Sequence, residues 1–312
     1  MRLRLGSRGS PLALWQAHHV ADQLRARWPR LVVDLSIVET QGDRSTEAEL
    51  TMGSATGIFV REIESALLSG AIDLAVHSLK DLPTETPQGL ALAATPPRHD
   101  ARDALVCRTA DSVAGLPHGA SVATGSPRRR SQLLNARPDL RCVPVRGNVD
   151  TRLRKLELGT FDALILAVAG IERLGLTQVP YTPIPLAMFL PAPGQGALAI
   201  ELRADDASTR RYVGPLDDSD TAATVAAERA FLAALGAGCL APAGAFATVA
   251  ADRLELDAMV GTPDGTRLLR QRSEGARGQA DELGAALARR LLDAGGDDIL
   301  REVRAADSTD GR

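Results

Sequence analysis

A pattern of a short strand, a Gly-Ser-Pro turn and a helix occurs twice in this chain and limits its fold more than any other feature. In the first copy, the alternating residues 2–5 lead into Gly9-Ser10-Pro11 and a helical pattern that extends to about residue 27. In the second copy, residues 120–123 lead into Gly125-Ser126-Pro127 and a helix through about residue 135. Serine is a preferred N-cap and proline suits the first helical position. The recurrence therefore predicts two similar α/β domains.

Other strand and helix patterns alternate along the chain in the order typical of α/β architecture. Pro96-Pro97 and the segment 190–196 break this alternation, so we expect the chain to leave the first domain and return to it there. From residue 216 the pattern predicts a third, smaller α+β domain. The expected limits are 1–96 with 197–215 for domain 1, 97–196 for domain 2 and 216–312 for domain 3.

The expected elements follow from local apolar spacing. Strands are expected at 31–38, 72–76, 141–145, 163–168, 245–249 and 254–260, and helices at 58–68, 221–235 and 280–294.

Charge and composition exclude several classes of protein. The 36 Lys and Arg residues nearly balance the 39 Asp and Glu residues. This balance argues against a surface with charge of a single sign, which many nucleic-acid binders have. Aromatic residues make up only 3%, too few for base-stacking platforms. No apolar run reaches the roughly 18 residues of a membrane span, and the N-terminal residues lack the apolar stretch of a secretory signal. Three widely spaced cysteines fit neither a disulfide framework nor a zinc site, so we expect a reduced, cytoplasmic protein without a metal.

Basic residues concentrate just after the second Gly-Ser-Pro turn. Residues 128–155 contain nine basic and two acidic side chains, a local net charge of +7 in a chain of net charge −3. The guanidinium fork binds two carboxylate or phosphate oxygens at once, and a helix N-terminus attracts anions. The stretch therefore indicates an anion-binding site. A solvated basic face, or a helix paired with acidic neighbours, is the alternative.

Lys80 and Asp81 follow an apolar strand, at the edge where open α/β sheets place their ligands. An aspartate beside a cation can exchange protons or stabilise a cationic intermediate, although an ordinary turn aspartate has the same local pattern. We interpret His77 as a hydrogen-bonded residue at the strand end. Cys239 lies in a loop of small residues, where it is either accessible or packed. Gly194-Gln195-Gly196 lacks the spacing of a dinucleotide fingerprint.

Seven segments together resemble one family, porphobilinogen deaminase (hydroxymethylbilane synthase). They occur in the family's order over nearly the whole chain, and the ordered set is far more specific than any single segment. The segments are residues 9–17 (GSPLALWQA), 77–83 (HSLKDLP), 125–129 (GSPRR), 145–153 (VRGNVDTRL), 167–170 (AVAG), 190–197 (LPAPGQGA) and the Cys239 loop.

The resemblance implies a fold and a reaction. Two α/β domains similar to periplasmic solute-binding proteins would face each other across a cleft, beside a third domain with the cysteine loop. The enzyme, a monomeric transferase of heme and tetrapyrrole biosynthesis, would join four porphobilinogen molecules head to tail. Each condensation would release ammonia, and the product would be the linear tetrapyrrole hydroxymethylbilane. The primer would be a dipyrromethane cofactor, attached to Cys239 by a thioether.

The resemblance also assigns roles to residues. Asp81 would be the catalytic aspartate. The acetate and propionate groups of the pyrroles would be bound by Arg8, Ser10, Lys80, Thr124, Ser126, Arg128, Arg129, Arg146, Arg152, Arg173 and Gln195. The chain departs from the family where Thr56 and Arg61 replace usual lysines, which puts lid contacts with substrate in doubt.

Two other functions are compatible with parts of the pattern. Paired α/β domains also occur in non-enzymatic solute-binding proteins, and release of ammonia from porphobilinogen would separate the two. A nucleic-acid binder could use the basic stretch, and its affinity would fall steeply with salt. Neither alternative accounts for the Cys239 loop or the Gln195 segment.

Overall fold

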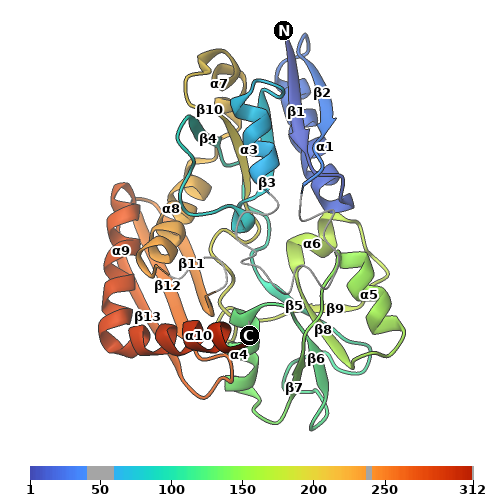
Figure 1. Ribbon diagram of the computed structural model, residues 1–312, viewed down its shortest axis with the longest axis vertical. Helices are drawn as coiled ribbons and strands as arrows, with labels where there is room; N and C mark the ends of the chain where they lie inside the picture. The colour runs from blue at the N-terminus through green and yellow to red at the C-terminus, as the bar shows by residue number, and fades with distance from the viewer. Residues whose placement is uncertain (41–59, 237–240, 311–312) are drawn as a thin grey trace. The chain divides into compact units, whose positions relative to one another are not determined.

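The computed structural model describes residues 1–40, 60–236 and 241–310, and these form two compact units (Figure 1). The first unit consists of Met1–His99 and Gly196–Ala222, and the second of Asp100–Gln195 and Ala223–Arg312. One sheet belongs to the first unit and two belong to the second. The division into three domains with limits at 96, 196 and 215 stays a prediction.

The first unit has a five-stranded sheet of order β2-β1-β3-β10-β4. The first three of these are parallel, and β10 runs antiparallel to both of its neighbours. Helix α1 packs on one face of the sheet and α3 on the other. Both faces of the sheet therefore bury apolar side chains. The elements are β1 (Arg2–Ser7), α1 (Pro11–Arg27), β2 (Val32–Ile37), α3 (Arg61–Leu68), β3 (Leu74–Ser78), β4 (Leu90–Ala94), β10 (Leu198–Arg203) and α7 (Ala207–Val213).

The second unit contains a five-stranded sheet of order β7-β6-β8-β5-β9. Its directions match those of the first sheet, since β7, β6 and β8 are parallel and β5 is antiparallel to both neighbours. The prediction of two similar α/β folds is therefore confirmed. The elements are β5 (Asp103–Val106), β6 (Ser121–Ala123), α4 (Pro127–Ala136), β7 (Arg141–Val143), α5 (Val149–Glu157), β8 (Ala163–Ala167), α6 (Val168–Arg173) and β9 (Tyr181–Pro183).

A three-stranded antiparallel sheet, β11-β12-β13, completes the second unit. Helices α8 and α9 bury one sheet face around Phe231 and Leu287, which are both 0% exposed. Gly295, with φ 104°, ends the helical run that the sequence pattern extends to residue 294, and α10 follows it. The smaller α+β module is thus confirmed. Its elements are α8 (Ser219–Ala234), β11 (Ala243–Ala250), β12 (Arg253–Gly261), β13 (Leu268–Ala276), α9 (Ala280–Leu291) and α10 (Asp297–Asp310).

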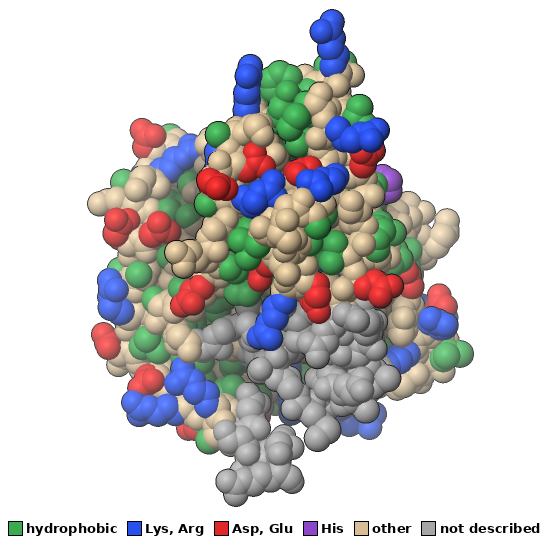
Figure 2. Space-filling view, turned by 45° about the horizontal axis from the view of Figure 1, so that its top comes forward, with side chains coloured by type: hydrophobic (Ala, Val, Ile, Leu, Met, Phe, Trp, Pro, Cys, Tyr) green, Lys and Arg blue, Asp and Glu red, His purple; other side chains and the backbone are tan. Residues whose placement is uncertain are grey.

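The described surface carries charges of both signs. On the face in Figure 2, acidic and basic side chains are interspersed, as the small net charge of the chain leads one to expect. None of the helices in the described ranges combines the length and apolar character that a membrane crossing requires.

Candidate functional site

The Lys80-Asp81 pair lies on a short turn that continues directly from the central strand β3. Residues Leu79–Asp81 form a 3-10 helix, and the backbone N–H of Leu79 donates to the carbonyl of Ala197 (3.1 Å). The Leu79 side chain is 1% exposed, whereas Asp81 is exposed and Lys80 is half-buried. The buried leucine anchors the turn to the sheet and leaves the Asp81 carboxyl at the surface of the unit.

Two side-chain hydrogen bonds, one of them buried, hold the strand end before this turn. His77 Nε2 lies 3.1 Å from Glu201 Oε2 on β10, and both side chains are almost fully enclosed. Gln16 on α1 donates to the hydroxyl of Ser78 (2.8 Å). His77 is therefore the hydrogen-bonded strand-end residue that the sequence predicts. Gln16 and Glu201 give no sequence signal for this role, because each contacts β3 only through the tertiary fold.

The first Gly-Ser-Pro turn forms the predicted helix start. Ser10 caps α1 by accepting a hydrogen bond from the N–H of Ala13 (3.4 Å), and Pro11 is the first helical residue. The hydroxyl of Ser7 bonds the carbonyls of Arg8 and Ala13 (3.1 Å each), which fixes the loop against the helix. Arg8 is half-buried at this N-terminus, where backbone N–H groups attract an anion.

The second Gly-Ser-Pro turn repeats this arrangement. Ser126 accepts a hydrogen bond from the N–H of Arg129 (3.4 Å), and the hydroxyl of Thr124 accepts one from the N–H of Ser126 (3.2 Å). A Cβ on Gly125 would lie 2.8 Å from the carbonyl oxygen of Val145, so the close approach of these two loops requires glycine here.

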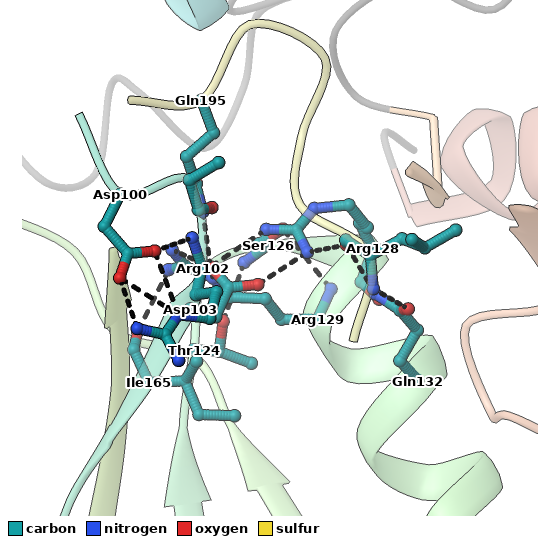
Figure 3. Close-up of polar contacts among 12 residues, drawn as sticks. Asp100, Arg102, Asp103, Thr124, Ser126, Arg128, Arg129, Gln132, Ile165 and Gln195 are labelled. Carbon is teal, nitrogen blue, oxygen red and sulfur yellow. Dashed lines mark hydrogen bonds and ion pairs between the residues drawn. The ribbon is translucent and has the colours of Figure 1, made fainter. Parts of the chain in front are cut away.

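The first two arginines of α4 point inward onto one carboxylate, that of Asp103 at the start of β5 (Figure 3). Arg128 donates from Nη1 to Asp103 Oδ2 (2.7 Å) and from Nη2 to Oδ1 (3.2 Å). Arg129 donates from Nε to Oδ1 (2.9 Å), and its Nη2 pairs with the same oxygen at 2.7 Å. Gln195 adds a hydrogen bond from Nε2 (2.9 Å). The structure thus brings three predicted site residues together around an aspartate that sequence reasoning missed.

Backbone carbonyls complete this cluster of Asp103, Arg128, Arg129 and Gln195. Arg128 Nη1 also donates to the carbonyl of Leu190 (2.5 Å), Arg129 Nη1 to that of Ile165 (3.0 Å) and Gln195 Nε2 to that of Ala101 (2.7 Å). The four side chains are almost fully buried, with Asp103 at 0% exposed and Arg129 at 6%. The cluster therefore connects β5, β8, α4 and the segment 190–195.

Electrostatics within the Asp103 cluster follow from burial and from its two-to-one ratio of charges. Burial alone would raise the pKa of Asp103, but the charges of Arg128 and Arg129 outweigh it and hold that pKa well below its usual value. Burial lowers the pKa of Arg128, although Asp103 opposes the shift. Asp103 is therefore a carboxylate, and it compensates only one of the two guanidinium charges.

The remaining predicted arginines lie on separate elements. Arg146 is exposed, and Arg152 on α5 donates from Nε to the carbonyl of Gly147 (2.7 Å). Arg173 ends α6 and is buried, and burial lowers its pKa to about 10. Arg137, also in the basic stretch, pairs with Asp139 through two 2.7 Å contacts. The basic residues of the stretch therefore differ in their contacts. For Arg137 the alternative interpretation holds, namely pairing with an acidic neighbour.

Two residues singled out from the sequence, Cys239 and Thr56, fall outside the described residues. Arg61 is the exposed first residue of α3. Cys107 is buried and Cys142 is half-buried, as packed cysteines are. Within the described ranges, no group of three or more His, Cys, Asp or Glu side chains is arranged to hold a metal ion.

Solved structures with some likeness to the chain include binding proteins. The methionine binding protein MetQ is 14% identical with a TM-score of 0.44, and the alignment covers 69% of this chain and 89% of that one. A Salmonella typhimurium periplasmic binding protein with high arginine specificity is 14% identical with a TM-score of 0.41, covering 71% and 93%.

Sequence comparison covers almost the whole chain. Residues 3–211 match the family described as porphobilinogen deaminase, dipyromethane cofactor binding domain, and residues 222–293 match the porphobilinogen deaminase C-terminal domain. The porphobilinogen deaminase of Trichlorobacter lovleyi is 47% identical over 304 residues, which cover 97% of this chain and 96% of that protein. This chain belongs to the porphobilinogen deaminase family.

Proposed function

We propose that this chain is the transferase that condenses four porphobilinogen molecules head to tail, with loss of ammonia, to give hydroxymethylbilane. The observation that carries the proposal is the match of residues 3–211 to the cofactor-binding domain of the porphobilinogen deaminase family. The near full-length relative supports the same reaction. The enzyme acts as a monomer in the cytoplasm, and its substrate is porphobilinogen. Sedimentation of the purified protein at the mass of one chain would support the monomeric state.

Carboxylate recognition is the main task that this substrate sets the protein. Each pyrrole carries an acetate and a propionate, so a growing chain accumulates negative charge. Arginine forks and capped helix starts suit such a polyanion. The proposed binding residues in the first unit are Arg8, Ser10 and Lys80, and those in the second unit are Thr124, Ser126, Arg128, Arg129, Arg146, Arg152, Arg173 and Gln195.

The donor set of the second unit fits a dipyrromethane cofactor. The Asp103 cluster leaves one guanidinium charge uncompensated, and the Arg173 side chain is a further buried cation. A carboxylate of a bound dipyrromethane would balance the surplus charge of the Asp103 cluster. Cys239 is the proposed point of attachment. When bound, the cofactor supplies a pyrrole carbon as the primer for chain growth.

Asp81 is the proposed catalytic residue, and its position suits that role. Loss of ammonia from porphobilinogen leaves an electron-poor azafulvene cation, which the next pyrrole attacks. A carboxylate near the pyrrole N–H groups stabilises this positive charge and can relay the released protons. The Asp81 carboxyl is exposed on a turn whose leucine is buried, so it is accessible while its backbone is fixed.

Intact-mass measurement tests the proposal. The active protein should exceed its sequence mass by one covalently attached dipyrrole. Cys239→Ser should lose this adduct, whereas the matched variant Cys107→Ser should retain it, because Cys107 is buried beside Thr109 and the carbonyl of Asp162. Active wild-type protein with the bare mass would refute the cofactor assignment.

A second experiment addresses the catalytic residue. Asp81→Asn should retain the adduct and lose turnover by about 100-fold or more, because proton transfer by a positioned side chain contributes 10²–10⁴-fold. Ammonia release from porphobilinogen is the assay, and it also separates this enzyme from a solute-binding protein. Normal turnover of the variant would remove Asp81 from the reaction.

A further inference from the structure

Asp103 is a buried carboxylate that accepts four side-chain hydrogen bonds, and it is not among the proposed catalytic or binding residues. Its side chain is 0% exposed at the start of β5, between the neighbouring strands β8 and β9. Both of its oxygens accept hydrogen bonds from guanidinium groups, and Oδ1 also accepts one from Gln195. These contacts fix the two arginine side chains relative to each other, as Figure 3 shows.

The geometry leaves little freedom to either guanidinium. Arg128 is held by Asp103 and by the carbonyl of Leu190, and Arg129 is held by Asp103 and by the carbonyl of Ile165. Gln132 in turn fixes Leu190, because its side chain donates to the Leu190 carbonyl (3.0 Å) and accepts from the Leu190 N–H (2.7 Å). The Asp103 carboxylate and these backbone carbonyls thus hold both arginines in fixed orientations before a ligand binds.

The charge of the cluster distinguishes it from an ordinary buried ion pair. Two guanidiniums and one carboxylate give a net charge of +1 in surroundings that are almost fully buried. An uncompensated charge is costly to bury, and a structural ion pair would need only one arginine. Within residues 1–40, 60–236 and 241–305, nothing accepts a hydrogen bond from Arg128 Nε, although this atom is buried. Both observations point to an anion as the missing partner.

The place of the cluster indicates which anion. Arg128 and Arg129 are in the first turn of α4, whose N-terminus is capped by Ser126 and preceded by Thr124. Helix N-termini favour negative charge within the first turn. Under the proposed function, the anions available are the carboxylates of a pyrrole, either on the cofactor or on porphobilinogen.

We propose that Asp103 is a positioning residue, which holds Arg128 and Arg129 in fixed orientation and cancels one of their two charges, so that the pair accepts one further pyrrole carboxylate. The inference rests on the proposed function. Asp103 itself does not touch the pyrrole. Its effect passes through the two arginines, which bind the ligand.

The test compares Asp103→Glu and Asp103→Asn with the control Asp139→Asn in the holoenzyme. Asp139 also binds an arginine with both oxygens, in the same unit but outside the cluster. Asp103→Glu keeps the charge and moves the carboxyl by one methylene group, which displaces both guanidiniums. Asp103→Asn removes the charge that compensates them, and if this variant does not fold, Asp103→Glu still decides.

Two readouts separate the sources of the carboxylate. If the cluster binds the cofactor, Asp103→Glu should lower the fraction of chains that carry the adduct. If it binds substrate, KM for porphobilinogen should rise by about 10- to 100-fold at full adduct content, with kcat within about threefold of wild type. Asp139→Asn should leave both quantities unchanged. A merely structural role of Asp103 would lower the unfolding temperature without moving KM or adduct content.

The possible failures are distinguishable. If the wild-type enzyme releases no ammonia from porphobilinogen, the proposed function is wrong. If Arg128→Gln raises KM or lowers adduct content whereas folded Asp103→Glu changes neither, the function stands and the positioning role of Asp103 is wrong.

Discussion

Replacing Gly284 by alanine tests how closely helices α9 and α8 must approach. A Cβ at this position would lie 2.2 Å from the carbonyl oxygen of Ala227, 2.8 Å from the N–H nitrogen of Phe231 and 2.9 Å from the Cβ of Ala230. Two of these neighbours are backbone atoms of α8 and cannot rotate away. Because non-bonded heavy atoms prefer separations of about 3.5 Å or more, the helices would have to move apart by roughly 1 Å.

The expected destabilisation is a difference of two opposing effects. Alanine in a helix interior is favoured over glycine by about 1 kcal/mol. Overpacking a well-packed core costs about 1–3 kcal/mol, and contact with backbone belongs at the upper end of that range. The displaced helix would also loosen the packing around Phe231 and Leu287, which are both 0% exposed. We therefore expect Gly284→Ala to lower the free energy of unfolding by about 2 kcal/mol.

Gly278→Ala is the matched control, because Gly278 lies just before α9, the helix that contains Gly284. No atom lies within 4 Å of the Cβ that it would gain, and its φ is not in the left-handed region. The substitution should be neutral or stabilise by up to about 1 kcal/mol, because alanine restricts the unfolded chain. Helix α8 ends five residues before Cys239, so Gly284→Ala perturbs the helix that leads to the proposed cofactor loop.

Urea unfolding with two probes provides the assay. Trp15 and Trp28 are the only tryptophans of the chain and both belong to the first unit, so their fluorescence reports on that unit. Far-ultraviolet circular dichroism reports on helices of both units. With a typical slope of about 2 kcal/mol per M, the dichroism midpoint of the second unit should fall by about 1 M in Gly284→Ala. If Gly284→Ala is as stable as Gly278→Ala, the argument from helix contact is wrong.

Two further predictions concern buried or partly buried carboxylates of the first unit. Although burial alone would raise its pKa, hydrogen bonds from Thr209 and neighbouring groups hold Asp206 at a pKa of about 2. A folded-state pKa below the unfolded value of about 3.9 gives stability that is present above pH 4 and lost as pH falls towards 2. Asp206→Asn should therefore flatten the dependence of the unfolding temperature on pH between these values. Removing the ring of His77 with His77→Leu leaves the Glu201 carboxyl buried without its 3.1 Å partner, so the tryptophan-detected urea transition should show a loss of about 1–3 kcal/mol; unchanged stability would contradict this.

The sequence predicts the two α/β sheets because their first strands and helices carry strong local signals. Both Gly-Ser-Pro turns place serine at the N-cap and proline at the first helical position, as the structure confirms. Strands such as β10 and β13 are absent from the predicted set. Strand β13 begins with two leucines and continues with charged, polar and small residues, and none of its positions is fully buried, so it lacks the apolar period that marks a strand. Its antiparallel pairing with β12 makes it a strand although its own sequence lacks the pattern.

The candidate site shows why charge counted along a sequence overstates the charge that can bind a ligand. The stretch 128–155 carries nine basic side chains, but Arg137 is paired with Asp139, which the net charge of +7 already counts. Arg128 and Arg129 share Asp103, which lies outside the stretch. Asp103 lies 25 residues before Arg128, in a strand of otherwise apolar residues, and no spacing rule connects the two. Its one signal is a charge directly before the short apolar run 104–106, and a charge that is buried with such a run requires a partner. A buried aspartate that is distant in sequence therefore has to be paired with the cations of a basic stretch before an anion site is inferred from them. For Arg128 and Arg129 a charge of +1 remains after pairing with Asp103, so these two arginines together can neutralise one further carboxylate.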